Sequence, residues 1–252
     1  MTVVSATLEH ATLSRSTEVE AIYATLIEQG IAIIPEFVDA ETLSELNKEF
    51  VSIIDHGRNL GFNVIERDEA VTVAIVRNRL SVHDYPTTSD VFSSQLMVDI
   101  ASGYYGGEKF ALNHQIYANL NKGTKEALAD LPFVPHLDKI HTLKFFIYLT
   151  DTTAENGAMG VVLASHHTNR EHRLRCLETN SDFRTVNNLV GGAETRPVEA
   201  PAGTLLIFET DITHTAGHVL PGRERRVLRG HTRTTEELKK LGLYKEAIDV
   251  TS

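Results

Sequence analysis

The sequence predicts an all-β core with flanking helices, arranged as an antiparallel sandwich or barrel. After about residue 105 the chain consists of short β-branched and aromatic runs, separated by turn residues such as Asn156-Gly157 and Pro221-Gly222. Closely spaced short strands of this kind are typical of antiparallel β-proteins. Before residue 105 the apolar residues mostly recur at helical spacing. We therefore expect N-terminal helices that pack against the β core.

The length and composition fit one domain and argue against one class of partner. The 252 residues are 42% hydrophobic and 23% charged, and no low-complexity linker divides them. We expect a single domain over residues 1–252, with helical support at about 15–105, a β core at about 108–234 and a helical tail at about 235–252. The formal net charge of -10 argues against a nucleic-acid partner.

Neither a secretory signal nor a membrane helix is expected. The segment from Met1 to His10 has no basic region followed by an apolar run, and no stretch approaches the roughly 18 apolar residues of a membrane span. The single cysteine, Cys176, excludes an internal disulfide and indicates a reducing compartment. The sequence therefore predicts a cytoplasmic protein without membrane contact and leaves the oligomeric state open.

The first sixty residues predict two helices around a short strand. Ser14 or Ser16 is expected to cap a helix that ends at Gly30, where glycine favours a left-handed stop. The apolar run 30–35 ends in proline and predicts a strand. Asp39 is expected to cap the second helix, which carries apolar residues on one face.

The rest of the chain predicts strands and two further helices. Residues 71–76 predict a strand, residues 90–102 a helix, and residues 110–120 a strand with alternating polarity. The later predicted elements are strands at 143–149, 159–163, 204–208 and 227–232, followed by a helix at 235–241.

His136, Asp138 and His214 form a candidate metal site. Because residues two apart on an extended segment point to the same side, the His136 imidazole and the Asp138 carboxylate can reach one ion together. His214 follows the strand at 204–208 and is the best candidate for a third ligand. Two histidines and one carboxylate leave the other metal positions open, which is the arrangement of non-haem iron(II) oxygenases.

Simpler interpretations compete with this site. In a chain with twelve histidines, a His-x-Asp triplet is a weak signal, and a surface histidine beside a solvated aspartate explains it about as well. His218 is a rival third ligand, because it would share a helix face with His214. Gly217 and Pro221 argue against a helix there.

Several motifs follow one another in a fixed order through most of the chain. They are His136-x-Asp138, the Asn156-Gly157 turn before residues 161–166, the run 202–208, and then His214 and Arg225. In this order and spacing, residues 20–235 resemble the phytanoyl-CoA dioxygenase family of iron(II)- and 2-oxoglutarate-dependent oxygenases. The resemblance implies a double-stranded β-helix (jelly-roll or cupin-like) packed by N-terminal helices. It also implies Fe(II), 2-oxoglutarate and O2 as cofactors, with His136, Asp138 and His214 as the catalytic iron ligands.

The resemblance also suggests which residues bind the cosubstrate. Arg225, eleven positions after His214, stands where the family pairs an arginine with the far carboxylate of 2-oxoglutarate. The family often has a serine or threonine two residues after the distal histidine, but this chain has Ala216. Thr213 or Thr215 takes that role, or no residue does. The pair at residues 166–167 matches a structural serine–histidine turn of the family, so we interpret it as structural.

Polar side chains near the predicted site are candidates for binding the substrate. In the resembling family the strand at 113–122 borders both cosubstrate and substrate, although an exposed edge strand explains its polarity equally well. Arg77 can recognise an anionic group, but a solvated loop is the simpler interpretation. The candidates are Tyr117, Asn119, Arg77, Lys139 and His141 on the substrate side, with Gln115 and Thr215 beside the cosubstrate.

The resemblance implies a dioxygenase that hydroxylates or otherwise oxidises a small-molecule metabolite. An amino acid, an amino-acid derivative or a natural-product intermediate is expected, because the chain has no basic stretch for larger anions. Related halogenases have glycine or alanine at the position of Asp138, so the carboxylate favours hydroxylation or desaturation. The alternatives are a metal-dependent hydrolase or isomerase on a cupin-like fold, and a non-catalytic ligand-binding β-sandwich. Arg225 argues against the hydrolase, and the intact set of four residues argues against a non-catalytic protein.

Overall fold

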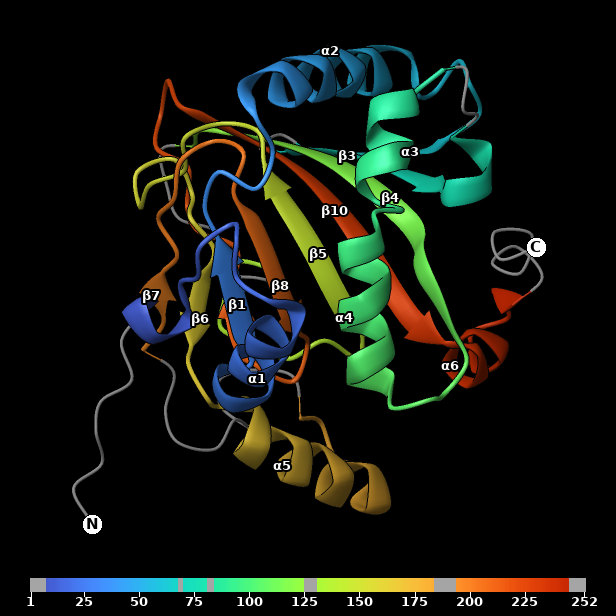
Figure 1. Cartoon of the computed structure of the whole chain (residues 1–252), viewed down its shortest axis with the longest axis vertical. Helices are drawn as coiled ribbons and strands as arrows, with labels where there is room; N and C mark the ends of the chain where they lie inside the picture. Colours follow the sequence, from blue (N-terminus) through green and yellow to red (C-terminus); the bar gives the residue numbers. More distant parts are fainter. Residues whose placement is uncertain (1–7, 68–69, 81–83, 125–130, 184–193, 245–252) are drawn as a thin grey trace.

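The computed structural model describes residues 8–67, 70–80, 84–124, 131–183 and 194–244, which form two antiparallel sheets and a set of helices (Figure 1). The seven-stranded sheet has the order β1-β8-β5-β10-β4-β3-β2, and the three-stranded sheet has the order β7-β6-β9. The strands are β1 (Ile31–Ile34), β2 (Asn63–Arg67), β3 (Ala70–Val76), β4 (Phe110–Lys122), β5 (Leu143–Tyr148), β6 (Gly160–Val162), β7 (Arg196–Pro197), β8 (Leu205–Glu209), β9 (Thr213–Thr215) and β10 (Glu224–Thr234). This arrangement confirms the predicted all-β core with flanking helices.

The helices gather on one face of the large sheet and at its lower end (Figure 1). In this view α1, α3 and α4 lie in front of the sheet, α2 runs along its upper end, and α5 lies below it. The elements are η1 (Leu8–Ala11), α1 (Val19–Gln29), α2 (Ala40–His56), η2 (Arg77–Arg79), α3 (Pro86–Val91), α4 (Gln95–Tyr105), α5 (His166–Thr179) and α6 (Thr235–Lys240). Within the described residues, no helix is long and apolar enough to cross a membrane.

Strand alternation divides the apolar side chains between two cores. In β8, Leu205 and Ile207 pack with the helices, whereas Leu206 and Phe208 pack with residues of the small sheet. The same alternation holds in β1 and β10, because successive side chains of a strand point to opposite faces. In β5, Phe145 belongs to the helix-side core, so Lys144 and Phe146 point to the space between the sheets. This alternation decides which strand side chains face the space between the sheets and can reach a ligand there.

Two of the predicted helix starts are corrected by the structure. The prediction that Ser14 or Ser16 caps the first helix is wrong, because the helix begins at Val19 with Glu18 at the cap position. The two serine hydroxyls instead lie 3.0 Å apart and hydrogen-bond to each other. The helix predicted at residues 90–102 is two helices, α3 and α4, separated by a short turn.

Several other predicted boundaries are confirmed. Gly30 ends α1 with a left-handed φ of 78°, and Asp39 caps α2 by accepting a hydrogen bond from the Thr42 amide at 2.8 Å. Thr234 and Glu237 form a capping box at the start of α6, at the predicted C-terminal helix. Residues 245–252 of the expected tail lie outside the described residues.

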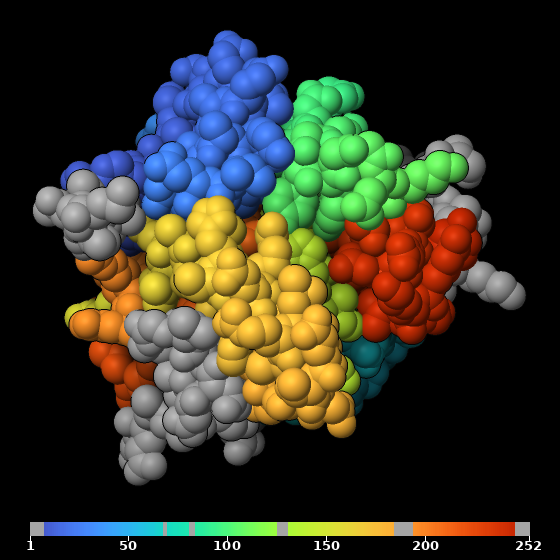
Figure 2. All heavy atoms as spheres, turned by 90° about the horizontal axis from the view of Figure 1, so that it is seen from below, coloured from blue at the N-terminus to red at the C-terminus, as the bar shows by residue number. Residues whose placement is uncertain are grey.

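The sequence analysis missed α5, which follows β6 and lies across the lower face of the molecule (Figure 2). Figure 2 shows its residues, coloured yellow to orange, at the centre of that face. The buried residues of α5 are His166, Asn169, Arg173 and Cys176, which recur at helical spacing. Most of them are polar, so the helix has no apolar stripe that a sequence pattern could reveal.

Candidate metal centre

Three potential metal ligands from distant parts of the sequence meet between the two sheets. His136 and Asp138 lie on the segment before β5, and His214 lies in β9. Reciprocal backbone hydrogen bonds join His136 to His214, with N–O distances of 2.9 and 3.1 Å. One ligand atom from each of the three side chains lies within 4.8 Å of the other two. The structure therefore brings together the three residues that the sequence singled out.

Both imidazoles present the same nitrogen to the carboxylate. His136 Nδ1 lies 2.8 Å from the Val134 carbonyl oxygen. His214 Nδ1 lies 2.8 Å from the Ile212 carbonyl oxygen. Because a carbonyl oxygen only accepts, both Nδ1 atoms carry the proton and both Nε2 lone pairs are free. The two Nε2 atoms lie 3.7 and 3.5 Å from Asp138 Oδ1, near the roughly 3 Å that separates neighbouring donors around one ion.

Burial and nearby charges put His136 and Asp138 in the protonation states that a metal needs. Burial, together with the neighbouring His214 ring, lowers the pKa of His136 to about 4, so its imidazole is neutral at pH 7. Burial alone would raise the pKa of Asp138, but the Lys144 ammonium and the adjacent His214 ring hold it well below its usual range. A neutral imidazole and an ionised carboxylate are the forms that bind divalent metals.

A buried lysine stands behind the carboxylate. Lys144 Nζ lies 2.5 Å from Asp138 Oδ2, while Oδ1 of the same carboxylate faces the two histidines. Lys144 is 5% exposed, and its ammonium lies 6.0 Å from the Phe146 ring centroid and 5.7 Å from that of Phe208. The ion pair explains how β5 accommodates a lysine among apolar residues. It also orients the carboxylate and leaves one oxygen available for a metal.

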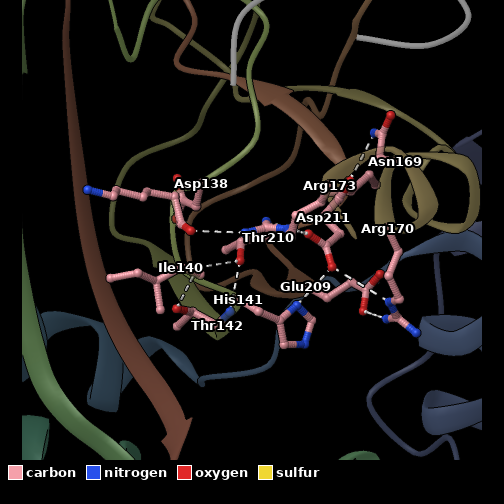
Figure 3. A network of polar contacts seen from close by, with 12 residues as sticks. Asp138, Ile140, His141, Thr142, Asn169, Arg170, Arg173, Glu209, Thr210 and Asp211 are labelled. Carbon is pink, nitrogen blue, oxygen red and sulfur yellow. Dashed lines mark hydrogen bonds and ion pairs between the residues drawn. The ribbon is translucent and has the colours of Figure 1, made fainter. Parts of the chain in front are cut away.

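Hydrogen bonds through Thr210 connect the segment of Asp138 to the segment that leads to His214 (Figure 3). The Asp138 amide donates to the Thr210 carbonyl at 3.3 Å. The Thr142 amide donates to the Thr210 hydroxyl oxygen at 2.8 Å, and that hydroxyl donates to the Ile140 carbonyl at 3.1 Å. These bonds fix the relative position of two segments that are far apart in the sequence. They explain how the backbone holds the potential ligands in position.

Helix α5 supports the His214 segment from the other side through ion pairs with two buried carboxylates (Figure 3). Glu209 and Asp211 are only 1% and 2% exposed. Arg170 Nη2 lies 2.5 Å from a Glu209 carboxylate oxygen, and Arg173 Nε donates to Asp211 Oδ1 at 2.5 Å. Asn169 Nδ2 donates to the Asp211 carbonyl at 2.9 Å. Each buried carboxylate therefore has a guanidinium partner within the chain.

A cavity of about 280 Å³ lies beside the three potential ligands. Inward side chains of β4, β5 and β10 form its walls, and the β2–β3 hairpin and the loop at Pro132 and Phe133 complete the lining. Small-molecule sites in proteins typically span about 300–1,000 Å³, so this cavity lies at the small end of the range. The potential ligands thus face a space suited to small molecules.

Arg225 lies in this cavity and is 8% exposed. Its Nη2 donates to Asn121 Oδ1 at 3.2 Å, and its Nη1 donates to the Gly157 carbonyl. Asn121 is its cross-strand neighbour in the β4–β10 register. Burial and the positive charge of Arg229 lower the pKa of Arg225, although Tyr148 opposes them. Arg225 is thus a buried cation whose contacts within the chain include no carboxylate among the described residues.

A second arginine in the cavity was not predicted. Arg229 lies four residues after Arg225 and shares its face of β10. The Arg229 guanidinium carbon lies 4.6 Å from the Tyr117 ring centroid and 6.0 Å from that of Phe146. Burial lowers the pKa of Arg229, and Tyr117 and Asp138 oppose this effect. The register places Tyr117 and Phe146 directly opposite Arg229 on the two neighbouring strands.

The residues predicted to contact cosubstrate or substrate divide into two groups. Tyr117, Asn119 and Thr215 line the cavity. Gln115 stands behind Tyr117 and accepts a hydrogen bond from its hydroxyl at 2.9 Å, without lining the cavity itself. Three other predicted contact residues, Arg77, Lys139 and His141, also lie outside the lining.

Each residue of the second group has a structural contact elsewhere. Arg77 Nη1 donates to the Leu112 carbonyl at 2.9 Å. The Lys139 carbonyl accepts a hydrogen bond from Arg173 Nη1 at 3.0 Å. His141 Nδ1 lies 3.0 Å from Asp211 Oδ2, so this side chain belongs to the ion network beneath α5. The geometry therefore does not place these three residues at a bound substrate.

The structure also distinguishes between the alternatives that the sequence left open. Of Thr213 and Thr215, only Thr215 lines the cavity, because the Thr213 hydroxyl accepts a hydrogen bond from Asn169 at 2.8 Å. His218 is not among the clustered potential ligands of the described residues. His166 is buried, and its Nε2 lies 2.9 Å from the Ile27 carbonyl oxygen, which agrees with a structural role.

Two of the residues that the sequence analysis missed could have been found from the sequence pattern. Lys144 interrupts an otherwise apolar strand, and a lysine in such a run requires a buried partner. Arg229 falls on the face of Arg225 by simple alternation. The partners of Arg170 and Arg173 depend on how α5 packs, which no local pattern reports.

The family model described as phytanoyl-CoA dioxygenase (PhyH) matches residues 26–227. No curated protein sequence matches the chain. Solved structures match its fold at low sequence identity. The epimerase SnoN from nogalamycin biosynthesis, in complex with Fe3+, alpha ketoglutarate and nogalamycin RO, has a TM-score of 0.63 and 18% identity, with 86% of this chain and 84% of that chain covered.

Two other solved structures are similar in size and fold. The alpha ketoglutarate-dependent carbocyclase SnoK has a TM-score of 0.58 and 15% identity, covering 89% of this chain and 87% of its own. HygX from Streptomyces hygroscopicus, with nickel, 2-oxoglutarate and hygromycin B bound, has a TM-score of 0.54 and 14% identity, covering 84% and 86%. The family match covers strands β1 to β9 and the start of β10, and it contains all three potential ligands. On this match, the chain belongs to the phytanoyl-CoA dioxygenase family.

Proposed function

We propose that this protein is an iron(II)- and 2-oxoglutarate-dependent oxygenase that hydroxylates a small-molecule metabolite. The observation that carries the proposal is the cluster of His136, Asp138 and His214 donor atoms beside a cavity that contains Arg225. Two imidazoles and one carboxylate are the ligand set of non-haem iron(II) oxygenases. Family membership and the iron and alpha ketoglutarate bound by SnoN support the same assignment.

The residues of the site have distinct roles in this proposal. His136 and His214 would hold the metal through Nε2, and Asp138 would hold it through Oδ1. Lys144 retains the second oxygen of Asp138 and so fixes the direction of the first. Arg225 would bind the distal carboxylate of 2-oxoglutarate, for which a guanidinium offers two parallel N–H donors. Thr215 lines the same cavity and is the candidate hydroxyl beside that cosubstrate.

Bound iron and 2-oxoglutarate together supply the oxidation, in which O2 is consumed, 2-oxoglutarate becomes succinate and CO2, and one oxygen atom enters the substrate. The chain supplies position and shielding. Phe133, Phe146 and Tyr148 line the cavity and exclude water from it. Asp138 occupies the position that glycine or alanine takes in related halogenases, which favours hydroxylation over halogenation.

Succinate release tests the proposal directly. The protein is incubated with Fe(II), 2-oxoglutarate and O2, and succinate is measured with and without pools of small metabolites. We expect a metabolite-dependent increase in succinate and a product heavier by one oxygen atom. A product of unchanged mass would instead indicate epimerisation, the activity named for SnoN. Zinc-dependent turnover of a metabolite without succinate would support a hydrolase and contradict the proposal.

Arg225→Ala is expected to raise the 2-oxoglutarate concentration needed for half-maximal rate by about tenfold or more, because a charge-assisted hydrogen-bond pair is lost. Arg223→Ala is the matched control. Arg223 is two residues away, just before β10, and its exposed side chain pairs with Glu155 at 3.1 Å and does not line the cavity. An unchanged 2-oxoglutarate requirement in Arg225→Ala would show that another residue binds the cosubstrate.

A further inference from the structure

The cavity is basic although the protein as a whole is acidic. The formal net charge of the chain is -10. Among the described residues that line the cavity, Arg67, Lys144, Arg225 and Arg229 are basic, and Asp138 is acidic. The acidic balance of the sequence argued against a nucleic-acid partner, but it does not describe the lining of the cavity. The charge that a bound small molecule meets has the opposite sign.

The metal centre and its proposed cosubstrate use two of these cations. Lys144 pairs with Asp138, at 2.5 Å. Arg225 contacts Asn121 and Gly157 and, in the proposed function, the distal carboxylate of 2-oxoglutarate. Both are therefore accounted for by the metal centre and its cosubstrate. Arg229 is accounted for by neither.

The Arg229 guanidinium is held in place without using its hydrogen-bond donors. It lies 4.6 Å from the Tyr117 ring centroid, a distance that fits a cation–π contact. The Tyr117 hydroxyl donates to Gln115, which fixes the ring. Among the described residues, no hydrogen-bond partner of the Arg229 side chain is present, and its Nε is buried without one. An ordered guanidinium whose N–H groups have no acceptor in the described part of the chain is prepared to bind one from a ligand.

The position of Arg229 separates it from the proposed cosubstrate site. Four residues along a strand correspond to about 13 Å between the backbones of Arg225 and Arg229. Both side chains nevertheless point into the same cavity. Arg229 is also near enough to Asp138 for the carboxylate to influence its pKa. A molecule held by Arg229 would thus lie close to the metal centre while 2-oxoglutarate occupies Arg225.

We propose that Arg229 recognises a carboxylate on the primary substrate, which is therefore a small carboxylic acid. The inference rests on the proposed function and extends it from a metabolite in general to an anionic one. The planar fork of a guanidinium matches a carboxylate, and the cavity volume of about 280 Å³ restricts the acid to a small one. The substrate carboxylate then orients the reacting carbon relative to the iron ligands.

Sodium benzoate and benzamide are suitable probes, because they share a shape that fits an aromatic cavity and differ in the carboxylate. Each is titrated anaerobically into the protein loaded with Fe(II) and saturating 2-oxoglutarate, and binding is measured by calorimetry. We expect benzoate to bind wild-type protein at least about tenfold more tightly than benzamide does. In Arg229→Leu this preference is lost. In Arg229→Lys, which keeps the charge but not the fork, it is intermediate.

The 2-oxoglutarate affinity of Arg229→Leu is the second readout. We expect it to stay within about twofold of wild type, a change well below that of losing a charged contact. A tenfold loss would assign Arg229 to the cosubstrate and overturn the inference. Equal binding of benzoate and benzamide by the wild type, or an unchanged benzoate preference in Arg229→Leu, would also overturn it. If the wild type binds neither iron nor 2-oxoglutarate, the proposed function fails instead, so the two failures are distinguishable.

Discussion

The two sides of the His214 segment differ in whether their arginines are paired with carboxylates. On the α5 side, Arg170 and Arg173 pair with Glu209 and Asp211. On the cavity side, Arg225 and Arg229 pair with no carboxylate among the described residues. A buried charge without a counterion is costly, so it is usually paired or neutralised. The comparison teaches that the first pair of arginines stabilises the fold, whereas the second pair is available to anionic ligands.

The largest effect is expected where the two sides meet, at the metal centre. Asp138→Ala should reduce succinate release to below about a thousandth of the wild-type rate, the scale of losing several kcal/mol of transition-state stabilisation. Loss of Asp138 also leaves Lys144 buried without its partner. The double variant Asp138→Ala/Lys144→Met controls for this and should regain stability without activity. Retention of metabolite-dependent succinate release by either variant would show that Asp138 is not a ligand.

Substitutions in the ion pairs on the α5 side should lower the free energy of unfolding. Asp211→Ala leaves Arg173 buried without a carboxylate, and breaking a buried pair in this way typically costs about 3–5 kcal/mol in the free energy of unfolding. Arg229→Leu is the matched variant on the cavity side and should change that free energy by less than about 1 kcal/mol. Urea unfolding measures both. Similar losses in the two variants would remove the distinction between a structural and a ligand-binding arginine.

The same ion pair predicts a dependence of stability on acid pH. Burial alone would raise the pKa of Asp211, but hydrogen bonds and charge from His141 and Arg173 lower it below 3.8, the ordinary value. Because the folded-state pKa is the lower one, the stabilisation is present above about pH 4 and is lost as the pH falls through the folded-state value. Asp211→Asn should flatten this decline in urea unfolding as the pH is lowered below about 4. An unchanged slope would show that other carboxylates dominate acid unfolding.

Among the ion pairs of α5, the exposure of the arginine should determine how much stability its removal costs. The side chain of Arg170 is 49% exposed and that of Arg173 is 8% exposed. Solvent screens the more exposed pair, so Arg170→Ala should cost about 1 kcal/mol or less. Arg173→Ala should cost more, because it also leaves the buried Asp211 carboxylate with fewer partners. Equal losses in urea unfolding would indicate that α5 packing, and not ion pairing, carries the stability.

How well each part of the molecule could be predicted depends on how local its physical cause is. The strands and their turns follow from alternation and turn residues, and the His136-x-Asp138 pair needs only an extended backbone. Once Arg225 is identified, strand alternation predicts that Arg229 lies on the same face of the strand. In contrast, β2 is largely exposed and α5 buries polar residues, so neither has a hydrophobic period. The roles of Lys144 and Arg173 depend on partners from distant segments, which only the tertiary arrangement brings together.

The most direct test of the account is the anaerobic addition of Fe(II) and 2-oxoglutarate to the apo-protein, followed by visible spectroscopy. We expect a weak charge-transfer band that requires both additions, persists in Arg229→Leu and is absent from Asp138→Ala. This result would place the metal on the predicted ligands and the cosubstrate on the metal. Absence of the band with correctly folded wild-type protein, or its full retention in Asp138→Ala, would contradict the account.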